Sequence, residues 1–215
     1  MVLGIDTSGK NLGLAICHDG QVLYSSLSKP GLRHGEILQK VLKDFLSSNE
    51  IGFRDLTGVS VTIGPGSFTG LRIGLAAAKG YSYSLQIPLA CVSALLAGAY
   101  AYSNFGKKVV VVIDARRNEY YWSMFDCSGK YPIRRSEDSI GSLSDLKEMA
   151  SEDIIFFGPS YLEKLFLAEI KRCEYHVSDD FNLAIIASCL GEQDIIKGKN
   201  VDTATVVPLY LRYRL

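Results

Sequence analysis

Hydrophobic and polar residues alternate at the start of the chain in a way that predicts three short strands. Apolar runs fill residues 2–5 and 12–17, and a third run follows at 21–26. The intervening segments are polar, and His18-Asp19-Gly20 is typical of a tight hairpin turn. The pattern therefore predicts a three-stranded meander.

A helical periodicity begins after this meander. From Arg33 to Ser48, apolar residues occupy positions 37, 38, 41, 42, 45 and 46, which cover about half of a helical cylinder. That band is broader than one core-facing stripe requires. The pattern then predicts a strand at 58–63, a helix at 68–85, a strand at 88–92 and a helix at 93–102.

The second half of the chain repeats the opening plan. It predicts a strand at 109–114, a turn at 115–119, a strand at 120–125 and a third strand at 131–135. Asp6 and Asp114 each end the first strand of a copy. The further predicted elements are a helix at 143–150, a strand at 154–157 and helices at 161–170 and 182–197, with His176 near a late strand.

This duplication predicts an α/β fold with two lobes. A meander followed by alternating helices and strands, with an aspartate ending the first strand, describes the actin-like ATPase and sugar-kinase architecture, a duplicated RNase H-like fold. We expect an N-terminal lobe at 1–103 and a smaller C-terminal lobe at 104–215. A single doubly wound sheet is the alternative.

Composition narrows the class of protein. The 215 residues are 47% hydrophobic and 21% charged, and 23 Lys+Arg balance 23 Asp+Glu, which argues against strong autonomous binding of nucleic acid. The chain opens directly into a strand, and its apolar runs are too short for a membrane span, so we expect a cytoplasmic protein. Five scattered cysteines without a Cys-x-x-Cys pair suit a reducing compartment better than a disulfide or metal framework.

Residues 64–74, Gly-Pro-Gly-Ser-Phe-Thr-Gly-Leu-Arg-Ile-Gly, connect a predicted strand to a predicted helix. Ser67 or Thr69 can cap that helix. Glycine at 64 and 66 permits unusual backbone angles or close approaches. A helix start also attracts anions, so the loop is either a phosphate cradle or a tight turn with packing glycines.

The two strand-end aspartates are candidates for metal or nucleophile chemistry. In this architecture one such carboxylate can hold magnesium near phosphates, and the other can activate a nucleophile. Thr7 and Ser8 follow Asp6 and complete a candidate phosphate turn. Asp114 is followed by bulky, charged residues without glycine, so the second turn looks filled. The alternative is that each aspartate caps its own turn.

Other catalytic constellations are not indicated by the sequence. His18, His34 and His176 form no His-x-x-x-His pair. Ser67 lacks the surroundings of a nucleophile elbow. The sequence therefore indicates neither a metal centre nor a Ser-His-Asp triad.

Five segments together resemble the bacterial TsaB (YeaZ) family, and they span essentially the whole chain. They are the 64–74 signature, Ile5-Asp6-Thr7-Ser8, Arg33-x-His-Gly-Glu36-Ile-Leu38, Asp114-Ala115-Arg116-Arg117-x-Glu119 and Pro208-Leu-Tyr210-Leu211-Arg212. The resemblance implies a non-catalytic partner in forming N6-threonylcarbamoyladenosine at position 37 of tRNAs that read codons beginning with A. It further implies pairing with the related transferase TsaD and with the ATPase TsaE, and contact with tRNA only through that complex.

The resemblance also bears on catalysis. The catalytic relative carries an Asn-His-x-x-Gly-His type metal motif, and Ala94 and Gly98 stand where its two histidines should be. Neither residue can coordinate a metal, so we expect no metal and no cofactor, with Asp6, Thr7, Ser8 and Asp114 as the remaining candidates for binding one. The alternatives are an ATP-dependent phosphotransferase of the sugar-kinase class and a metalloprotease; the latter lacks a histidine pair.

A partner surface is predicted on the first two helices. Gly70, Gly74 and Ala78 recur every four residues, which lets helix backbones approach closely. We expect this surface to bind the TsaD homologue, and to form a homodimer when the chain is alone. The predicted interface residues are Arg33, His34, Leu38, Val41, Leu42, Phe45, Phe68, Gly70, Leu71, Gly74, Leu75 and Ala78. The alternative is that both helix faces are used within the lobe.

Overall fold

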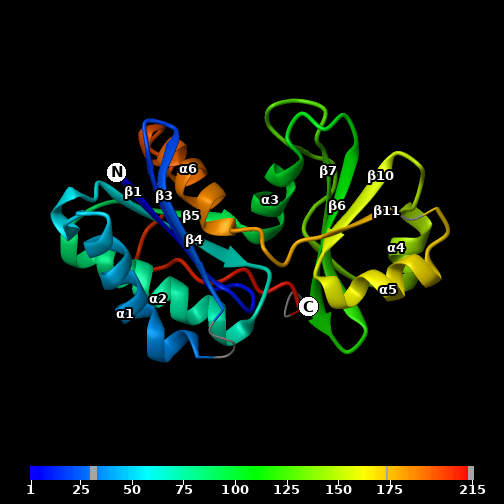
Figure 1. Ribbon diagram of the computed structural model, residues 1–215, viewed down its shortest axis with the longest axis horizontal. Helices are drawn as coiled ribbons and strands as arrows, with labels where there is room; N and C mark the ends of the chain where they lie inside the picture. The colour runs from blue at the N-terminus through cyan, green and yellow to red at the C-terminus, as the bar shows by residue number, and fades with distance from the viewer. Residues whose placement is uncertain (30–32, 173, 213–215) are drawn as a thin grey trace. The chain divides into compact units, whose positions relative to one another are not determined.

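Two β-sheets with the same strand order organise the chain, as seen in a computed structural model that describes residues 1–29, 33–172 and 174–212 (Figure 1). The first sheet contains β1 (Val2–Asp6), β2 (Leu12–His18), β3 (Gln21–Ser28), β4 (Gly58–Gly64) and β5 (Leu89–Ser93). The second contains β6 (Lys108–Arg116), β7 (Glu119–Asp126), β8 (Ile133–Arg134), β9 (Ser139–Ser142), β10 (Ile154–Gly158) and β11 (Glu174–Val177).

The strand order confirms the predicted duplication. The first sheet runs β3-β2-β1-β4-β5, and the second runs β8-β7-β6-β10-β11, so β6 takes the place of β1. β1 pairs antiparallel with β2 and parallel with β4, and β6 likewise pairs antiparallel with β7 and parallel with β10. Asp6 and Asp114 lie at corresponding ends of β1 and β6. The α/β class with two repeated units is therefore correct, and a single doubly wound sheet is excluded.

One predicted strand differs from the structure. The expected third strand of the second meander, 131–135, is only the two-residue β8 (Ile133–Arg134); β9 (Ser139–Ser142) follows it, and both pair with β7. Between them, side-chain bonds take part in holding the chain beside β7: Ser136 Oγ accepts a hydrogen bond from the Met124 amide at 2.9 Å, and Arg134 pairs with Asp138. These side-chain bonds compete with the strand ladder and interrupt it.

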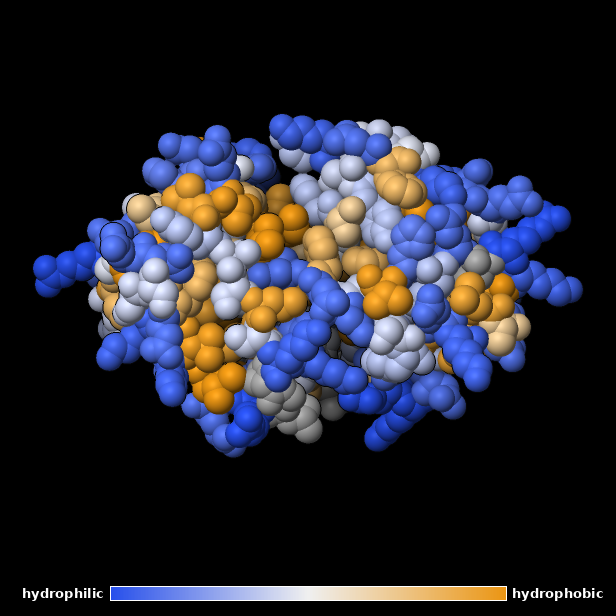
Figure 2. All heavy atoms as spheres, in the orientation of Figure 1, coloured by the Kyte–Doolittle hydropathy of each residue, from blue (hydrophilic) through white to orange (hydrophobic). Residues whose placement is uncertain are grey.

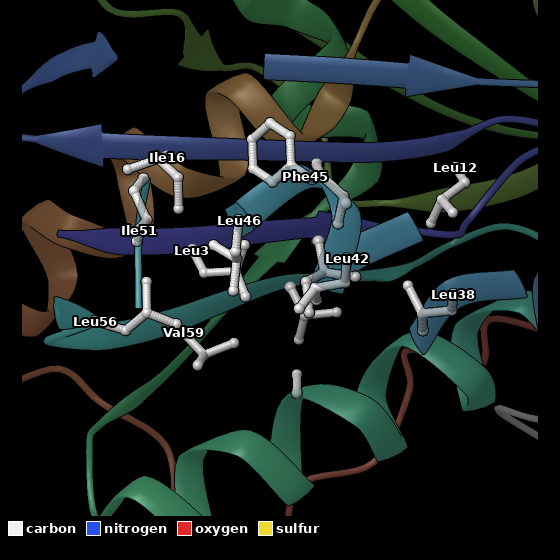
Figure 3. Close-up of a cluster of buried hydrophobic side chains, with 14 of the residues drawn as sticks. Leu3, Leu12, Ile16, Leu38, Leu42, Phe45, Leu46, Ile51, Leu56 and Val59 are labelled. Carbon is white, nitrogen blue, oxygen red and sulfur yellow. The ribbon is translucent and has the colours of Figure 1, made fainter. Parts of the chain in front are cut away.

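The helices cover both faces of each sheet. They are α1 (His34–Ser48), α2 (Phe68–Leu85), α3 (Ala94–Ala99), α4 (Leu143–Met149), α5 (Ser160–Glu169) and α6 (Leu183–Ile196), with 3₁₀ turns at Phe53–Asp55 and Tyr100–Tyr102. Side chains of α1 and α2 form one core with the first sheet, in which Leu3, Leu42 and Val59 are fully buried or nearly so (Figure 3). Separate cores place α4 and α5 on one face of the second sheet and α3 on the other.

α6 packs on the first sheet, against β1, β2, β4 and β5. A Cβ built on Gly4 would lie 2.4 Å from the Ala184 carbonyl oxygen, and one on Gly191 would lie 2.3 Å from Ser60. The small residues on both sides therefore let the helix backbone approach the sheet closely. Together α1, α2 and α6 enclose the first sheet from both sides.

This packing divides the chain differently from a single boundary between residues 103 and 104. Unit 1 comprises Met1–Ala94 and Asn182–Leu209, whereas unit 2 comprises Leu95–Phe181 and the described residues from Tyr210 onward. α3 packs with unit 2, and α6 returns to unit 1. Within the described ranges, no helix combines the length and the apolar character needed to cross a bilayer.

Candidate functional site

The glycine-rich loop interlocks with the turn after β1. Ser67 caps α2 by accepting a hydrogen bond from the Gly70 amide at 3.2 Å, as predicted, and its own amide donates to the Ser8 carbonyl at 2.7 Å. Thr7 Oγ1 donates to the Gly70 carbonyl at 2.7 Å. A Cβ on Gly66 would lie 2.4 Å from the Ser8 carbonyl oxygen. These glycines are thus explained by close packing within the chain, without a bound phosphate.

Three positions in the 64–74 segment show why glycine is needed there. Gly64 has φ +109°, a backbone conformation that side chains disfavour. A Cβ on Gly70 would lie 2.0 Å from the Thr7 carbonyl oxygen, and one on Gly74 would lie 2.3 Å from Thr7 Oγ1. The small-residue stripe of α2 therefore faces the β1–β2 turn of its own unit.

Asp6 is buried inside this interlock, with 5% of its surface exposed. Its Oδ1 accepts hydrogen bonds from the Ser8 amide at 3.1 Å, from Ser8 Oγ at 2.7 Å and from Thr62 Oγ1. The carboxylate therefore caps its own turn and ties β1 to β4. The candidate residues Asp6, Thr7 and Ser8 do come together, and their hydrogen bonds join parts of the unit to one another.

Asp114 also caps its own turn. Its Oδ1 accepts from the Arg116 amide at 2.7 Å, and its Oδ2 accepts from the Tyr161 hydroxyl at 3.1 Å. Burial, followed by the charge of Asp114, raises the pKa of Tyr161 to about 12, so the phenol stays protonated as a donor at neutral pH. Arg116, Arg117 and Asn118 all have positive φ, at 67°, 59° and 60°. All three residues are exposed, and the Arg116 amide is already bonded to Asp114.

Arg212 joins the closing motif to this hairpin. Its guanidinium donates to the Ala115 carbonyl at 2.7 Å and pairs with Glu119 at 2.7 Å. His34, from another predicted motif, is buried and lies 2.9 Å from the Asn11 carbonyl oxygen through Nε2. These motif residues, which are far apart in the sequence, therefore form hydrogen bonds and ion pairs that connect segments within each unit.

The positions that would correspond to a histidine metal motif offer no ligand atoms. Ala94 is buried at 1% exposure, and a Cβ on Gly98 would lie 2.9 Å from Val111 Cγ1. In the parts of the chain that the structure describes, no group of three or more His, Cys, Asp or Glu side chains could hold a metal ion.

The predicted interface residues divide by exposure. Arg33 and Phe68 are exposed, and Val41 is half-buried. The others are buried inside unit 1: His34, Leu38, Leu42, Phe45, Gly70, Leu71, Gly74, Leu75 and Ala78. Ile37 and Val41 also pack against the core, so the broad apolar band of α1 is used within its own unit. Most of the predicted set therefore supports the helices instead of presenting a surface.

A groove between α1 and α2 remains open beside this buried stripe. It has a volume of about 710 Å³ and is lined by Gly35, Leu38, Gln39, Phe53, Ile73, Ala76, Ala77, Gly80, Tyr81, Ser84 and Leu85. None of these lining residues carries a charge. Figure 2 shows hydrophobic side chains at the surface over this part of unit 1, at the lower left. Phe53 stacks on Tyr81 at one side, with ring centroids 5.4 Å apart.

The groove residues on α2 were missed by the sequence reasoning, although a signal existed. Residues 73, 76, 77, 80, 81, 84 and 85 recur at helical spacing, adjacent to the stripe of Gly70, Gly74 and Ala78. Two neighbouring stripes of small and apolar residues on one helix cannot be ranked by pattern alone. The structure assigns the first stripe to the interior and the second to the surface.

Comparison with known proteins supports the resemblance drawn from the motifs. The chain is 29% identical over 160 residues to the tRNA threonylcarbamoyladenosine biosynthesis protein TsaB of Bacillus subtilis, covering 73% of this chain and 70% of the relative. It is 32% identical over 127 residues to TsaB of Escherichia coli, covering 58% of this chain and 54% of the relative. That second match thus spans about half the length of the curated protein.

A solved structure shows the same fold. YeaZ from Pseudomonas aeruginosa superposes with a TM-score of 0.79 over 98% of this chain and 99% of that chain, at 21% identity. The family model described as TsaD, tRNA N6-adenosine threonylcarbamoyltransferase, matches residues 30–158. Because this match covers more than half of the sequence, the chain belongs to the TsaD family, in which the relatives compared here carry the name TsaB.

Proposed function

We propose that this chain is a non-catalytic subunit in the formation of threonylcarbamoyladenosine at position 37 of tRNAs that read codons beginning with A. The observation that carries the proposal is a TsaD-family fold in which Ala94 and Gly98 offer no metal ligands. A member without these ligands would contribute by supporting a related catalytic chain. The expected partners are a TsaD homologue and the ATPase TsaE, and tRNA binds through the assembled complex.

The groove between α1 and α2 is the surface we propose for TsaD. It is uncharged, and its small residues would allow a partner helix to approach closely. Gly80 leaves open space, since a Cβ there would meet nothing within 4 Å. Alone, the chain would cover the same apolar surface by forming a two-fold homodimer.

Reconstitution with the TsaD homologue and TsaE tests the function. We expect modification of substrate tRNA to require this chain. Equal modification with and without the chain would contradict the proposal.

A charge placed in the groove tests the surface. Ala76→Arg introduces an unpaired charge at an exposed groove position, so the affinity for TsaD should fall at least tenfold, about 1.4 kcal/mol. Ser47→Arg, on an exposed part of α1 outside the groove, is the matched control and should bind like the wild type. Circular dichroism should show that both variants are folded. Undiminished binding by Ala76→Arg would place the interface elsewhere.

Size-exclusion chromatography with light scattering tests self-association. Ala76→Arg should be monomeric, and added TsaD should convert the wild-type homodimer into a heterodimer. A stable complex containing TsaD together with an intact homodimer would contradict shared use of the groove.

The nucleotide chemistry of the isolated chain separates this proposal from a phosphotransferase. We expect no ATP turnover, because Asp6 and Asp114 accept hydrogen bonds from the backbone amides of their own turns. Metal-dependent ATP hydrolysis that is lost in Asp6→Ala would instead support the phosphotransferase.

A further inference from the structure

Two cysteines from distant parts of the sequence meet within unit 1. Cys17 lies in β2 and Cys189 in α6, and their Sγ atoms are 2.8 Å apart. Leu12, Leu14 and Ile16 point from β2 into the core beneath α1 and α2. Because strand side chains alternate, Cys17 points to the opposite face, where α6 packs. Strand and helix geometry therefore both direct the two thiols toward each other.

The two thiols differ in accessibility. Cys17 is fully buried, whereas Cys189 is partly exposed. Glu192, one turn further along α6, is buried and lies 3.5 Å from Cys17 Sγ through Oε2. Burial raises the pKa of the Cys17 thiol, and the neighbouring Cys189 and Glu192 raise it further. Cys17 is therefore held as a thiol, and Cys189 is the sulfur that an oxidant can reach first.

We propose that Cys17 and Cys189 form a reversible disulfide that fastens α6 to β2 under oxidising conditions. A peroxide is the oxidant. The Cys189 thiolate attacks the peroxide, forming an S–O bond and breaking the O–O bond, and the released hydroxide is protonated to water. Cys17 then attacks the sulfenic sulfur, so that the S–S bond forms and the hydroxyl leaves with the Cys17 proton as a second water. Two thiols are oxidised and one peroxide is reduced, and a dithiol reductant reverses the reaction.

The position of this pair gives the disulfide a structural consequence. Unit 1 is built from two chain segments, Met1–Ala94 and Asn182–Leu209, and the Leu95–Phe181 segment of unit 2 lies between them in sequence. Cys17 belongs to the first segment and Cys189 to the second. The disulfide would join the segments covalently and close a long loop, which restricts the unfolded chain most strongly. Oxidation would thus stabilise the docking of α6 on the first sheet.

Peptide mapping of the purified chain tests the proposal. The protein is reduced, freed of reductant and treated with a small molar excess of hydrogen peroxide; the remaining thiols are alkylated and the chain is digested without reduction. We expect a linked peptide containing Cys17 and Cys189, and it should be absent from Cys189→Ser. Cys91→Ser is the matched control, because it removes a partly buried thiol elsewhere in unit 1 and should leave the link intact. Cys173 lies outside the described residues, and its peptide is monitored in the same digest.

Thermal unfolding provides the second measurement. The oxidised wild type should melt roughly 5 °C above the reduced protein, and dithiothreitol should remove this difference. The same treatment should produce no rise in Cys189→Ser. Oxidation of Cys189 to sulfinic acid without a link, or a link to Cys91 or Cys173 instead, would overturn the proposal. A Cys17–Cys189 link with an unchanged or lower melting temperature would overturn its stabilising role.

Discussion

The interlock between α2 and the β1–β2 turn predicts opposite effects for one substitution at two glycines of the same helix. Gly70→Ala places a Cβ 2.0 Å from the Thr7 carbonyl oxygen, whereas Gly80→Ala places one in open space. A relaxed carbon–oxygen contact requires about 3.3 Å. The backbone segments around Gly70 must therefore separate by more than an ångström, although both are buried.

This separation determines how much Gly70→Ala lowers the free energy of unfolding. Overpacking of a tight interior costs about 1–3 kcal/mol. The hydrogen bonds from Thr7 Oγ1 to Gly70 and from Ser67 to Ser8, both 2.7 Å, would lengthen or break at about 1 kcal/mol each. The higher helix propensity of alanine relative to glycine offsets at most about 1 kcal/mol of this loss. We therefore expect Gly70→Ala to lower the free energy of unfolding by about 2–4 kcal/mol, and the melting temperature by about 5–15 °C.

The assay is urea and thermal unfolding followed by circular dichroism. Gly80→Ala should raise the free energy of unfolding by about 0.5–1 kcal/mol, because it gains helix propensity without a clash. Each protein is measured at two concentrations, so that any contribution from self-association appears as a concentration dependence. A Gly70→Ala variant as stable as the wild type, or a shift of both alanine variants in the same direction, would rule out the steric clash at Gly70.

Three further predictions concern other joints of the fold. Asn182 caps α6 and donates to two strand carbonyls, so Asn182→Ala should lower the free energy of unfolding in urea by about 2–3 kcal/mol. Asn182→Ser can keep the cap and should lower it by less; equal decreases would contradict a role for the cap. Hydrogen bonding from Arg135 lowers the pKa of Asp126 from 3.8 to about 2. The contribution of Asp126 to stability is therefore present above pH 3.8 and disappears as the pH falls to about 2. NMR titration of Arg135→Gln should show the pKa of Asp126 moving back up, and an unchanged pKa would exclude Arg135 as the cause. Arg212→Lys should speed amide hydrogen exchange in the β6–β7 hairpin, because lysine cannot bond the Ala115 carbonyl and Glu119 in the same fork geometry. Unchanged exchange would show that the hairpin is stable without Arg212.

Much of the fold follows from local pattern. The helix predicted at 68–85 is α2 (Phe68–Leu85), and the strand predicted at 58–63 is β4 (Gly58–Gly64). Side-chain period, turn residues and the Ser67 cap act over a few residues, so the sequence carries them directly. The duplication was visible for the same reason, because each copy repeats the same short signals. The absence of ligand atoms at positions 94 and 98 is likewise a property of the residues themselves.

The location of the candidate partner surface could not be predicted from local pattern, because it depends on how α2 packs. The spacing of Gly70, Gly74 and Ala78 shows that another backbone can approach α2, but not which backbone does so. The chain uses that stripe for its own β1–β2 turn and leaves the groove along Ile73 and Gly80 open.

The sequence by itself determined the elements, their order, their repetition and the side chains available for chemistry. Only the tertiary structure decided that α6 returns to the first sheet, that Arg212 holds the β6–β7 hairpin, and that Cys17 meets Cys189. α6 is apolar on most sides, so its sequence pattern does not single out the face that packs on a sheet. Contacts between residues so far apart in the sequence depend on the path of the whole chain and on which surfaces fit closely. The local periodicity of the sequence does not determine that path.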